Sequence, residues 1–378
     1  MTPLNILHVF RAPVGGLFRH VLDLTREQIA RGHRVGLVAD LRTGGARAED
    51  ALRKIEPLLA LGLSRVAMRR QPAASDIFVL AHVMRRVAQA KADIVHGHGA
   101  KGGGYARLVF ANKRAARAYT PHGGSLLFGH ETLAGKFHLT TERLLMSRGD
   151  LFLFESVFSA DMFASKIGNP RGLVRIVHNG VSRAEFERVA ARMDATDLVF
   201  LGELRLLKGI DVLIDAIAAM RNNGRSVTAT LVGDGPDREM FKGQISRLGL
   251  DTAVRLMPAM PARAAFAFGR IMVAPSRHES LPYVVLEAAA AGKPLITTKV
   301  GGIPEIYGPL SNTLVPPNDP AALTRAIAGA LDGPSAMTDI TQRLRERVKA
   351  SFSIDSMVDG VLTAYQTALE ALVKSGRR

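Results

Sequence analysis

Short apolar runs alternate with amphipathic segments along most of the chain. The first run, residues 6–10, has the length and β-branching of a buried strand. Gly15 and Gly16 follow it, apolar positions then recur at helical spacing over residues 21–30, and a second apolar run covers residues 35–39. This succession of strand, glycine turn, helix and strand is the βαβ unit from which parallel sheets are built.

The same pattern recurs and then starts again near residue 197. The first series adds strands at residues 93–96, 117–120, 151–155 and 174–177. The second series predicts strands at 198–201, 227–232, 271–275 and 295–298, and helices at 210–220, 282–291 and 354–372. Because 378 residues exceed what one core usually supports, we predict an α/β protein with two Rossmann-like, doubly wound domains. The expected ranges are 1–185, 186–350 and a final helix within 351–378.

Composition narrows the class of protein without identifying it. The hydrophobic fraction of 47% and the charged fraction of 22% are ordinary for a globular protein. There is no cysteine, so disulfides and thiolate chemistry are excluded. The sequence shows neither a signal-peptide pattern nor an apolar run of the roughly 18 residues that span a bilayer. These features predict a cytoplasmic protein.

The positive charge is concentrated in one half of the chain. Residues 1–190 carry a net charge of +13, and residues 191–378 carry +3. A basic half suggests an anionic partner such as a lipid headgroup surface, a phosphorylated acceptor or nucleic acid, although a solvated basic surface is the alternative. Five tyrosines, no tryptophan and no basic run interleaved with aromatic residues argue against nucleic acid.

Two carboxylates lie in the segment that follows one strand of the second series. Glu279 falls in the loop after strand 271–275, and Glu287 lies between one and two turns into the next helix. Open α/β sheets bind ligands at the carboxyl ends of their strands, and a helix start favours phosphate. Two carboxylates beside a phosphate are electrostatically unfavourable unless each accepts hydrogen bonds from hydroxyl groups, and a sugar supplies such hydroxyls. The alternative is a helix-capping glutamate and a surface glutamate.

Two cations follow the first strand of the second series. Arg205 and Lys208 lie between strand 198–201 and helix 210–220, at the sheet edge expected for Glu279. A diphosphate leaving group needs cationic neutralisation, which an arginine and a lysine can supply without a metal. Ordinary solvated charge is the alternative.

Glycines and histidines follow strands of the first series. Gly15 and Gly16 would allow the backbone to approach a ligand closely, or would form a tight turn. His98 and His122 each follow a predicted strand, so both should face the same sheet edge. Either histidine could instead be structural.

Other familiar motifs are missing or incomplete. The stretch from Gly97 to Gly102 fits the glycine pattern of a dinucleotide site, but the acidic residue expected about 20 positions later is absent. There is no P-loop, no D-x-D and no H-E-x-x-H, so no metal or cofactor is expected.

Taken together, these residues resemble the retaining glycosyltransferases of family 4, which have the GT-B fold of two Rossmann-like domains facing across a cleft. The most specific match is the seven-residue separation of Glu279 and Glu287, followed by Gly301-Gly302-Ile303-Pro304-Glu305. Supporting matches are Gly15-Gly16, His122-Gly123, Asn179-Gly180-Val181, Arg205 with Lys208, and residues 232–236. The family often has glycine or Gly-Phe after the first glutamate, and Ser280-Leu281-Pro282 departs from that pattern.

The resemblance implies a role for each site residue. Glu279 would hold hydroxyls of the donor sugar, Glu287 the ribose hydroxyls, and His122 the sugar at its 6-position, while His98 would lie on the acceptor side. Catalytic roles are implied for His122, Glu279, Arg205 and Lys208. The implied nucleotide-binding positions are Gly15, Gly16, Arg205, Lys208, Gly233, Ser280, Leu281, Pro282 and Glu287.

The resemblance also implies partners and a mechanism. The donor would be a UDP- or GDP-sugar, and the acceptor a glycan or lipid-linked hydroxyl in envelope polysaccharide or glycolipid synthesis. Transfer would occur on one face of the sugar with retention of configuration, without a dedicated base or a metal. The final helix would pack back on the N-terminal domain. We also expect the basic half to attach to the inner membrane through basic, partly apolar segments at residues 52–70 and 107–117, the second of which contains Arg107, Lys113, Arg114 and Arg117. The alternatives are a sugar-nucleotide epimerase of the same fold and a non-catalytic nucleotide-sugar binding protein.

Overall fold

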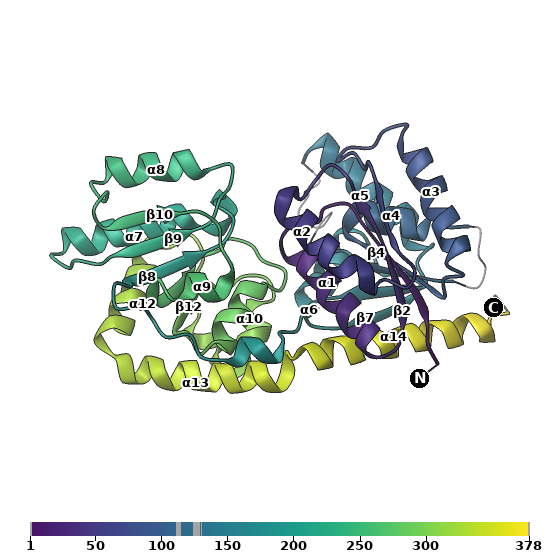
Figure 1. The fold of residues 1–378 in the computed structure, drawn as a ribbon. Helices are drawn as coiled ribbons and strands as arrows, with labels where there is room; N and C mark the ends of the chain where they lie inside the picture. The colour runs from purple at the N-terminus through teal and green to yellow at the C-terminus, as the bar shows by residue number, and fades with distance from the viewer. Residues whose placement is uncertain (1, 111–114, 124–128, 130, 377–378) are drawn as a thin grey trace. The chain divides into compact units, whose positions relative to one another are not determined.

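The computed structural model describes residues 2–110, 115–123, 129 and 131–376, and the chain divides into two compact units. The first unit comprises residues 1–179 and 355–378, and the second comprises residues 180–354. Each unit has its own parallel sheet with helices packed against it (Figure 1). The predicted α/β architecture with two doubly wound domains is confirmed.

The first unit is built on a seven-stranded sheet in the order β3-β2-β1-β4-β5-β6-β7. Its strands are β1 (Asn5–Phe10), β2 (Arg34–Asp40), β3 (Leu63–Val66), β4 (Ile94–His98), β5 (Ala116–Thr120), β6 (Leu151–Phe154) and β7 (Leu173–Ile176). Its helices are α1 (Gly15–Ala30), α2 (Gly45–Ile55), α3 (Asp76–Gln89), α4 (Gly99–Arg107), α5 (Leu133–Met146) and α6 (Val157–Lys166), joined by α14 (Ile354–Lys374) from the end of the chain. The order reverses between β1 and β4, so the carboxyl ends of these two strands flank the position where such sheets bind ligands.

The second unit has a five-stranded sheet in the order β10-β9-β8-β11-β12. Its strands are β8 (Thr196–Leu201), β9 (Ala229–Val232), β10 (Val254–Met257), β11 (Gly269–Ala274) and β12 (Leu295–Thr297). Its helices are α7 (Ile210–Asn222), α8 (Arg238–Arg247), α9 (Ala262–Phe266), α10 (Tyr283–Ala290), α11 (Ile303–Tyr307), α12 (Pro320–Asp332) and α13 (Pro334–Ser351). Here the order reverses between β8 and β11, the two strands that the candidate carboxylates and cations follow.

The final helix changes unit near its start. Residues from Asp355 onward belong to the first unit, where Arg31 of α1 forms ion pairs with Asp355 (3.0 Å) and Asp359 (3.3 Å). The hydroxyl of Tyr365 lies 2.6 Å from Nδ1 of His96, a residue of β4. Packing of α14 on the first unit is therefore carried by a buried polar contact as well as by its apolar residues.

The unit boundary lies a few residues before the one expected at 185/186, and the second boundary lies a few residues after 350/351. The reason is a parallel bridge between Val181 and Ser353, in which Val181 donates to the carbonyl of Phe352 (2.9 Å) and Ile354 donates to that of Val181 (3.0 Å). A side chain at Gly180 would collide with the carbonyl of Ser353, so glycine permits this close approach. The two segments at which the chain passes from one unit to the other are thus hydrogen-bonded to each other within the second unit.

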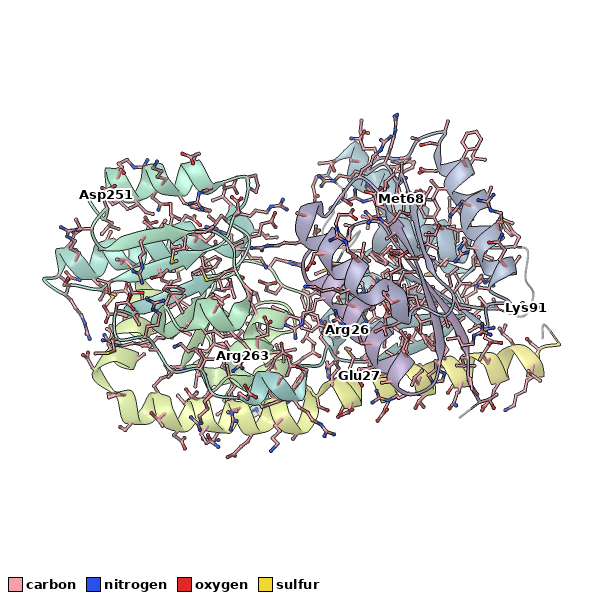
Figure 2. The ribbon with its side chains drawn as sticks, viewed as in Figure 1. Arg26, Glu27, Met68, Lys91, Asp251 and Arg263 are labelled. Atoms are coloured by element: carbon pink, nitrogen blue, oxygen red, sulfur yellow. The ribbon has the colours of Figure 1, made fainter. Side chains whose placement is uncertain are left out.

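Charged side chains such as Arg26, Lys91 and Asp251 point outward, whereas Met68 is buried (Figure 2). Among the residues that the structure describes, no helix combines the length and apolar character needed to cross a bilayer.

Candidate active site

Glu279 forms the centre of a polar cluster at the carboxyl end of β11. Its Oε1 accepts from Nζ of Lys208 at 2.6 Å and from the hydroxyl of Ser276 at 2.7 Å. The side chain of Glu279 is 11% exposed and that of Lys208 is 25% exposed, so the pair is largely shielded from bulk water but not sealed off. The structure therefore brings together two residues that are 71 positions apart and that the sequence placed at the same sheet edge.

The loop that carries Glu279 is held by its neighbours. The hydroxyl of Thr298, just after β12, donates to the carbonyl of Ser276 at 2.6 Å, and Gly302 donates to that of Ser280 at 2.7 Å. Gly301 has φ +57°, and a side chain there would collide with the carbonyl of Glu279. The glycine pair after β12 therefore serves to seat the Glu279 loop, which gives a physical reason for its place in the motif.

Lys208 is positioned by a second set of backbone contacts. It ends the short 3₁₀-helix Leu206–Lys208, directly before α7, and Leu207 accepts a backbone hydrogen bond from Arg277 at 2.9 Å. Arg277 also forms a bidentate pair with Asp211 of α7, at 2.7 and 2.6 Å. Sequence reasoning missed this pair, which joins the start of α7 to the loop after β11.

Arg205 lies in the same loop but has a different environment. It pairs with Glu203 at 3.0 Å, and both side chains are about half exposed. An exposed pair of this kind contributes little to stability and can be exchanged for another anion at small cost. The structure thus places Lys208 against Glu279 and leaves Arg205 on a solvent-facing turn of the same loop.

The remaining nucleotide-binding candidates of the second unit lie near this cluster in the chain. Gly233 follows β9, and the backbone of that loop bonds to the Arg205 loop through Leu204, which donates to Asp234 at 2.9 Å. Helix α10 begins at Tyr283, so Pro282 is the residue before the helix and not its first residue as expected. Glu287 is half-buried, on the second turn of α10.

In the first unit, Gly15 and Gly16 open helix α1 after β1. Gly15 has φ +61°, a conformation that favours glycine. His98 and His122 lie at the same sheet edge as expected, and they also contact each other, because Nδ1 of His98 lies 3.0 Å from Nε2 of His122. His122 itself has φ +51°, and an ordinary side chain held in this region indicates that its position matters.

Sequence reasoning missed three further histidines beside this pair. His8 of β1 lies opposite His96 of β4 in the sheet register, and Nδ1 of His8 lies 2.9 Å from Nε2 of His98. His20 of α1 packs edge-on against His122, with ring centroids 4.8 Å apart. His8 and His96 lie within apolar strands. The feature that could have indicated the cluster from the sequence is that His8, His96 and His98 fall in two adjacent parallel strands, β1 and β4.

Burial keeps this cluster uncharged at neutral pH. It lowers the pKa of His8 and of His20 to about 4, and lowers the pKa values of His96, His98 and His122 well below the ordinary range. Neutral imidazoles are also metal ligands, and two groups, His8/His96/His98 and His20/His98/His122, have nitrogens within 4.8 Å of one another. These are the described groups that could accept a cation in the first unit.

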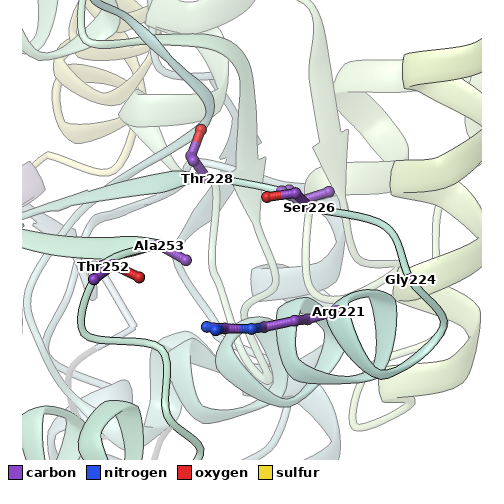
Figure 3. Close-up of a pocket in the computed structure, with 7 residues that line it drawn as sticks. Arg221, Gly224, Ser226, Thr228, Thr252 and Ala253 are labelled. Atoms are coloured by element: carbon purple, nitrogen blue, oxygen red, sulfur yellow. The ribbon is translucent and has the colours of Figure 1, made fainter.

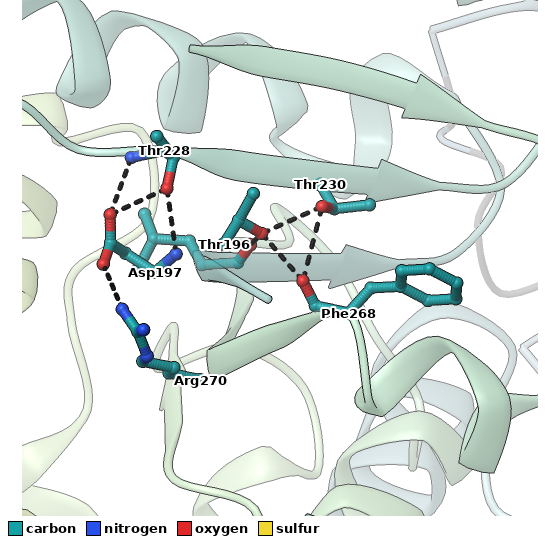
Figure 4. Close-up of polar contacts among 7 residues, drawn as sticks. Thr196, Asp197, Thr228, Thr230, Phe268 and Arg270 are labelled. Atoms are coloured by element: carbon teal, nitrogen blue, oxygen red, sulfur yellow. Dashed lines mark hydrogen bonds and ion pairs between the residues drawn. The ribbon is translucent and has the colours of Figure 1, made fainter. Parts of the chain in front are cut away.

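A cavity lies at the amino ends of the strands of the second sheet, but the residues that line it do not form a catalytic arrangement. A cavity of about 260 Å³ is lined by Arg221, Ser226, Thr228 and Thr252 (Figure 3). Beside it, Asp197 accepts from Thr228 and from Arg270, which ties the first residues of the strands together (Figure 4). Because ligands of such sheets bind at the opposite edge, we assign these polar groups to holding the sheet.

Comparisons with known proteins agree with this geometry. A family model described as "Glycosyltransferase Family 4" matches residues 14–185, and one described as "Glycosyl transferases group 1" matches residues 195–333. The first match covers strands β2 to β7, and the second covers strands β8 to β12.

Similar proteins carry glycosyltransferase names. The chain is 25% identical to D-inositol 3-phosphate glycosyltransferase 1 of Catenulispora acidiphila, over 94% of this chain and 91% of that one. It is 28% identical to the putative colanic acid biosynthesis glycosyltransferase WcaL of Escherichia coli, over 84% and 80%. The structure of Anabaena Alr3699/HepE, solved with UDP, matches with a TM-score of 0.78 at 18% identity, over 96% and 99%. This chain is a glycosyltransferase that belongs to group 1 and family 4 and has the GT-B fold.

Proposed function

We propose that the protein transfers a hexosyl group from a UDP- or GDP-sugar to an acceptor hydroxyl, with retention of configuration and without a metal. The observation that carries this proposal is the Glu279 cluster, in which a carboxylate and Lys208 share one site at the carboxyl edge of the second sheet. A diphosphate and a sugar together need both groups. The structures of one neighbour, Anabaena Alr3699/HepE, with UDP and with UDP-glucose support a nucleotide-sugar donor.

In the proposed reaction, the bond between the anomeric carbon and the phosphate oxygen breaks while the acceptor oxygen bonds to the same face of that carbon. The acceptor proton passes to the departing phosphate oxygen, so no protein base is required. Lys208 and Arg205 stabilise the charge that develops on the diphosphate, and Glu279 orients the sugar hydroxyls. Catalysis then consists of positioning and electrostatic stabilisation.

The proposal is tested by incubating the protein with a panel of UDP- and GDP-sugars and glycan acceptors. Release of UDP or GDP that depends on the acceptor, with product of unchanged anomeric configuration by NMR and undiminished rate in EDTA, is the expected result. An epimerised donor would indicate a sugar-nucleotide epimerase, and binding without turnover of any donor would indicate a non-catalytic binding protein.

Glu287 is expected to bind the nucleotide and not the reacting sugar. Glu287→Ala should weaken the affinity for free UDP or GDP by about 1–3 kcal/mol, the scale for losing charged hydrogen bonds. Isothermal titration calorimetry measures this directly. The matched control is Glu239→Ala, an exposed glutamate in the first turn of α8. Unchanged affinity in the Glu287 variant would remove this residue from the nucleotide site.

The proposed acceptor is a lipid-linked glycan of the cell envelope; the relative named for colanic acid biosynthesis supports a polysaccharide product. A peripheral enzyme would reach such an acceptor by resting on the anionic inner membrane. The structure corrects which residues could make that contact. Arg107 is completely buried against Glu142 at 2.8 Å, and Arg117 is paired with Asp150, so neither is a surface cation as expected. Lys113 and Arg114 lie outside the described residues.

Exposed apolar side chains offer a better candidate for the membrane-facing surface. Phe78 at the start of α3 is 77% exposed and Leu133 at the start of α5 is 86% exposed. Residues of both helices, including Asp76 and Phe137, line one hollow of about 190 Å³ in the first unit. Exposed Arg69 and Arg70 precede α3 in the chain, so apolar and basic groups are available together.

Cosedimentation with liposomes is expected to show binding that requires anionic lipid and fades with salt. Each basic side chain near such a surface contributes about 1 kcal/mol, and salt screens this attraction. Phe78→Glu should reduce binding, whereas Met193→Glu, at a fully exposed position of the second unit, should leave it unchanged. Equal, negligible binding to anionic and neutral liposomes would contradict membrane attachment and leave glycosyl transfer untouched.

A further inference from the structure

Three histidines of the first unit bring their rings together from three different parts of the chain. His20 lies on α1, His98 ends β4, and His122 follows β5. The ring centroids of His20 and His122 are 4.8 Å apart, those of His98 and His122 are 5.3 Å apart, and those of His20 and His98 are 5.8 Å apart. One nitrogen of each ring lies within 4.8 Å of one nitrogen of each of the other two. Three imidazole nitrogens at this spacing can surround one cation.

The amide of Asn179 determines which nitrogen of His20 can bind a metal. Its Oδ1 lies 3.0 Å from Nδ1 of His20, and an amide oxygen can only accept a hydrogen bond. Nδ1 of His20 therefore carries the proton. A neutral imidazole has one donor and one acceptor nitrogen, so Nε2 of His20 has a lone pair. Metal-binding histidines have this arrangement, in which the second ring nitrogen donates to a carbonyl or carboxylate oxygen.

The amide of Gln28 has the same effect on His98 through one intervening ring. Oε1 of Gln28 lies 2.9 Å from Nε2 of His8, so this nitrogen of His8 is protonated and its Nδ1 is an acceptor. Nδ1 of His8 lies 2.9 Å from Nε2 of His98, so Nε2 of His98 donates and Nδ1 of His98 keeps a lone pair. Gln28, His8 and His98 are at most 1% exposed, so water does not compete for these bonds.

His122 supplies the third nitrogen. Its Nε2 lies 3.0 Å from Nδ1 of His98, and in the metal-free protein one proton lies between these two nitrogens. Two nitrogens of a tetrahedral zinc site, with Zn–N bonds of about 2.0–2.1 Å, are about 3.4 Å apart. A cation therefore requires only a small separation of the two rings and takes the place of that proton, which moves to Nδ1 of His122. The partial exposure of His122 gives a cation access to the cluster and allows water to act as a fourth ligand.

The neighbouring group of His8, His96 and His98 is less suited to a cation. The nitrogen of His98 that faces His8 carries a proton in this arrangement and has no lone pair for a metal. Both nitrogens of His96 lie against hydroxyl groups, since Nδ1 is 2.6 Å from that of Tyr365 and Nε2 is 2.8 Å from that of Thr120. The proton positions set by the two amides thus favour the group that contains His20.

We propose that His20, His98 and His122 bind one Zn²⁺ or similar divalent transition-metal ion, with Asn179 and Gln28 as positioning residues. The ligand atoms are Nε2 of His20, Nδ1 of His98 and Nε2 of His122. Imidazole suits Zn²⁺, Cu²⁺ and Ni²⁺, whereas Mg²⁺ and Ca²⁺ prefer oxygen ligands. The bound ion joins α1, β4 and the segment after β5. The proposed glycosyl transfer requires no metal, so the two proposals are tested separately.

Zinc binding is measured on the full, tag-free chain after dialysis against EDTA and then against metal-free buffer. Equilibrium dialysis with ZnCl₂ at neutral pH is expected to give one tightly bound Zn²⁺ per chain, and CoCl₂ in its place should give the intense visible absorption of a tetrahedral Co²⁺ site. Zn²⁺, and not Mg²⁺, should raise the melting temperature, because an ion that binds only the folded chain stabilises it. Absence of stoichiometric Zn²⁺ binding would overturn the proposal.

Single substitutions locate the ion. His20→Phe keeps a ring and removes one ligand, so stoichiometric binding should be lost, whereas His96→Phe changes only the neighbouring group and should retain it. The reverse result would assign the ion to His8, His96 and His98 and would contradict the proposal. His278→Phe, in the second unit, is the matched control. If a variant does not fold, ¹⁵N NMR of the histidine-labelled unaltered chain gives the answer, because Zn²⁺ should shift the signals of unprotonated ring nitrogens and leave Nδ1 of His20 protonated.

The two amides are tested by substitutions that remove or keep the acceptor. Gln28→Leu should lower the affinity for Zn²⁺ about tenfold, the lower end of the cost of losing an outer hydrogen bond to a metal ligand. Gln244→Leu, at a buried glutamine of the second unit, should leave the affinity unchanged. Asn179→Asp should retain or increase the affinity, since a carboxylate accepts from Nδ1–H of His20 and makes that ring a stronger ligand. Unchanged affinity in the Gln28 variant, or weaker binding in the Asn179 variant, would overturn the positioning role of that amide.

Discussion

Lys208→Ala is expected to lower turnover by about 10²–10³, the usual cost of removing one group that stabilises transition-state charge. Lys208 lies 2.6 Å from Glu279, so its position is fixed before substrate arrives and no ordering is required during the reaction. Removing the ammonium also leaves the carboxylate of Glu279, which is 11% exposed, beside a diphosphate without a compensating charge. Steady-state kinetics should therefore show a larger change in kcat than in KM.

Arg205→Ala is the informative comparison. Because Arg205 is half-exposed and paired with Glu203, it must leave that pair and move to reach a diphosphate. We expect its removal to lower turnover as well, in proportion to the charge it supplies. Near-normal turnover in both variants would contradict the role given to these cations. Arg221→Ala, at the amino end of the same sheet, serves as a control that removes a cation outside the proposed site.

The fold and the Glu279 cluster could be predicted because they depend on short-range patterns. Alternating apolar runs and helical segments fix a parallel sheet, and the carboxyl ends of parallel strands share one edge. Glu279 and Lys208 each follow a strand of the second series, so their meeting needs only correct strand order. The difference between Lys208 and Arg205 could not be predicted, since it depends on how one loop turns within three residues.

Only part of the histidine cluster could be predicted from the sequence, because its members occupy different positions relative to the strands. His98 and His122 follow predicted strands, whereas His8 and His96 lie within them. A single histidine inside an apolar run does not change the hydrophobic pattern, so the sequence does not mark it as part of a site. Arg107 shows the same limit in the opposite direction. It looked like a surface cation in a basic segment, but it is neutralised by Glu142, a residue 35 positions later on α5. Partners distant in sequence decide whether a charge is solvated.

The histidines should make the first unit unstable in mild acid, well before the second. All of the eleven histidines except His278 belong to the first unit. A histidine whose folded pKa is lowered binds a proton more weakly than the unfolded chain does, so its contribution to stability is complete above the unfolded pKa of about 6.5 and is lost as pH falls toward the folded value. For His8 and His20 that window extends from about 6.5 to about 4.

Protonation of these two imidazoles alone is expected to cost the first unit about 3 kcal/mol each at the lower end of the window, at 1.36 kcal/mol per unit of pKa shift. Together they cost about 6 kcal/mol, which already lies within the 5–15 kcal/mol by which domains are stable. His96, His98 and His122 act in the same direction. Hydrogen exchange measured by mass spectrometry from pH 7 to 4 should show α1, β1 and β4 losing protection while β8 and β11 retain it. His20→Gln should flatten the pH dependence of the first unit, and His278→Gln should leave it unchanged. Parallel loss of protection in both units would show that carboxylates, and not the buried histidines, govern acid unfolding.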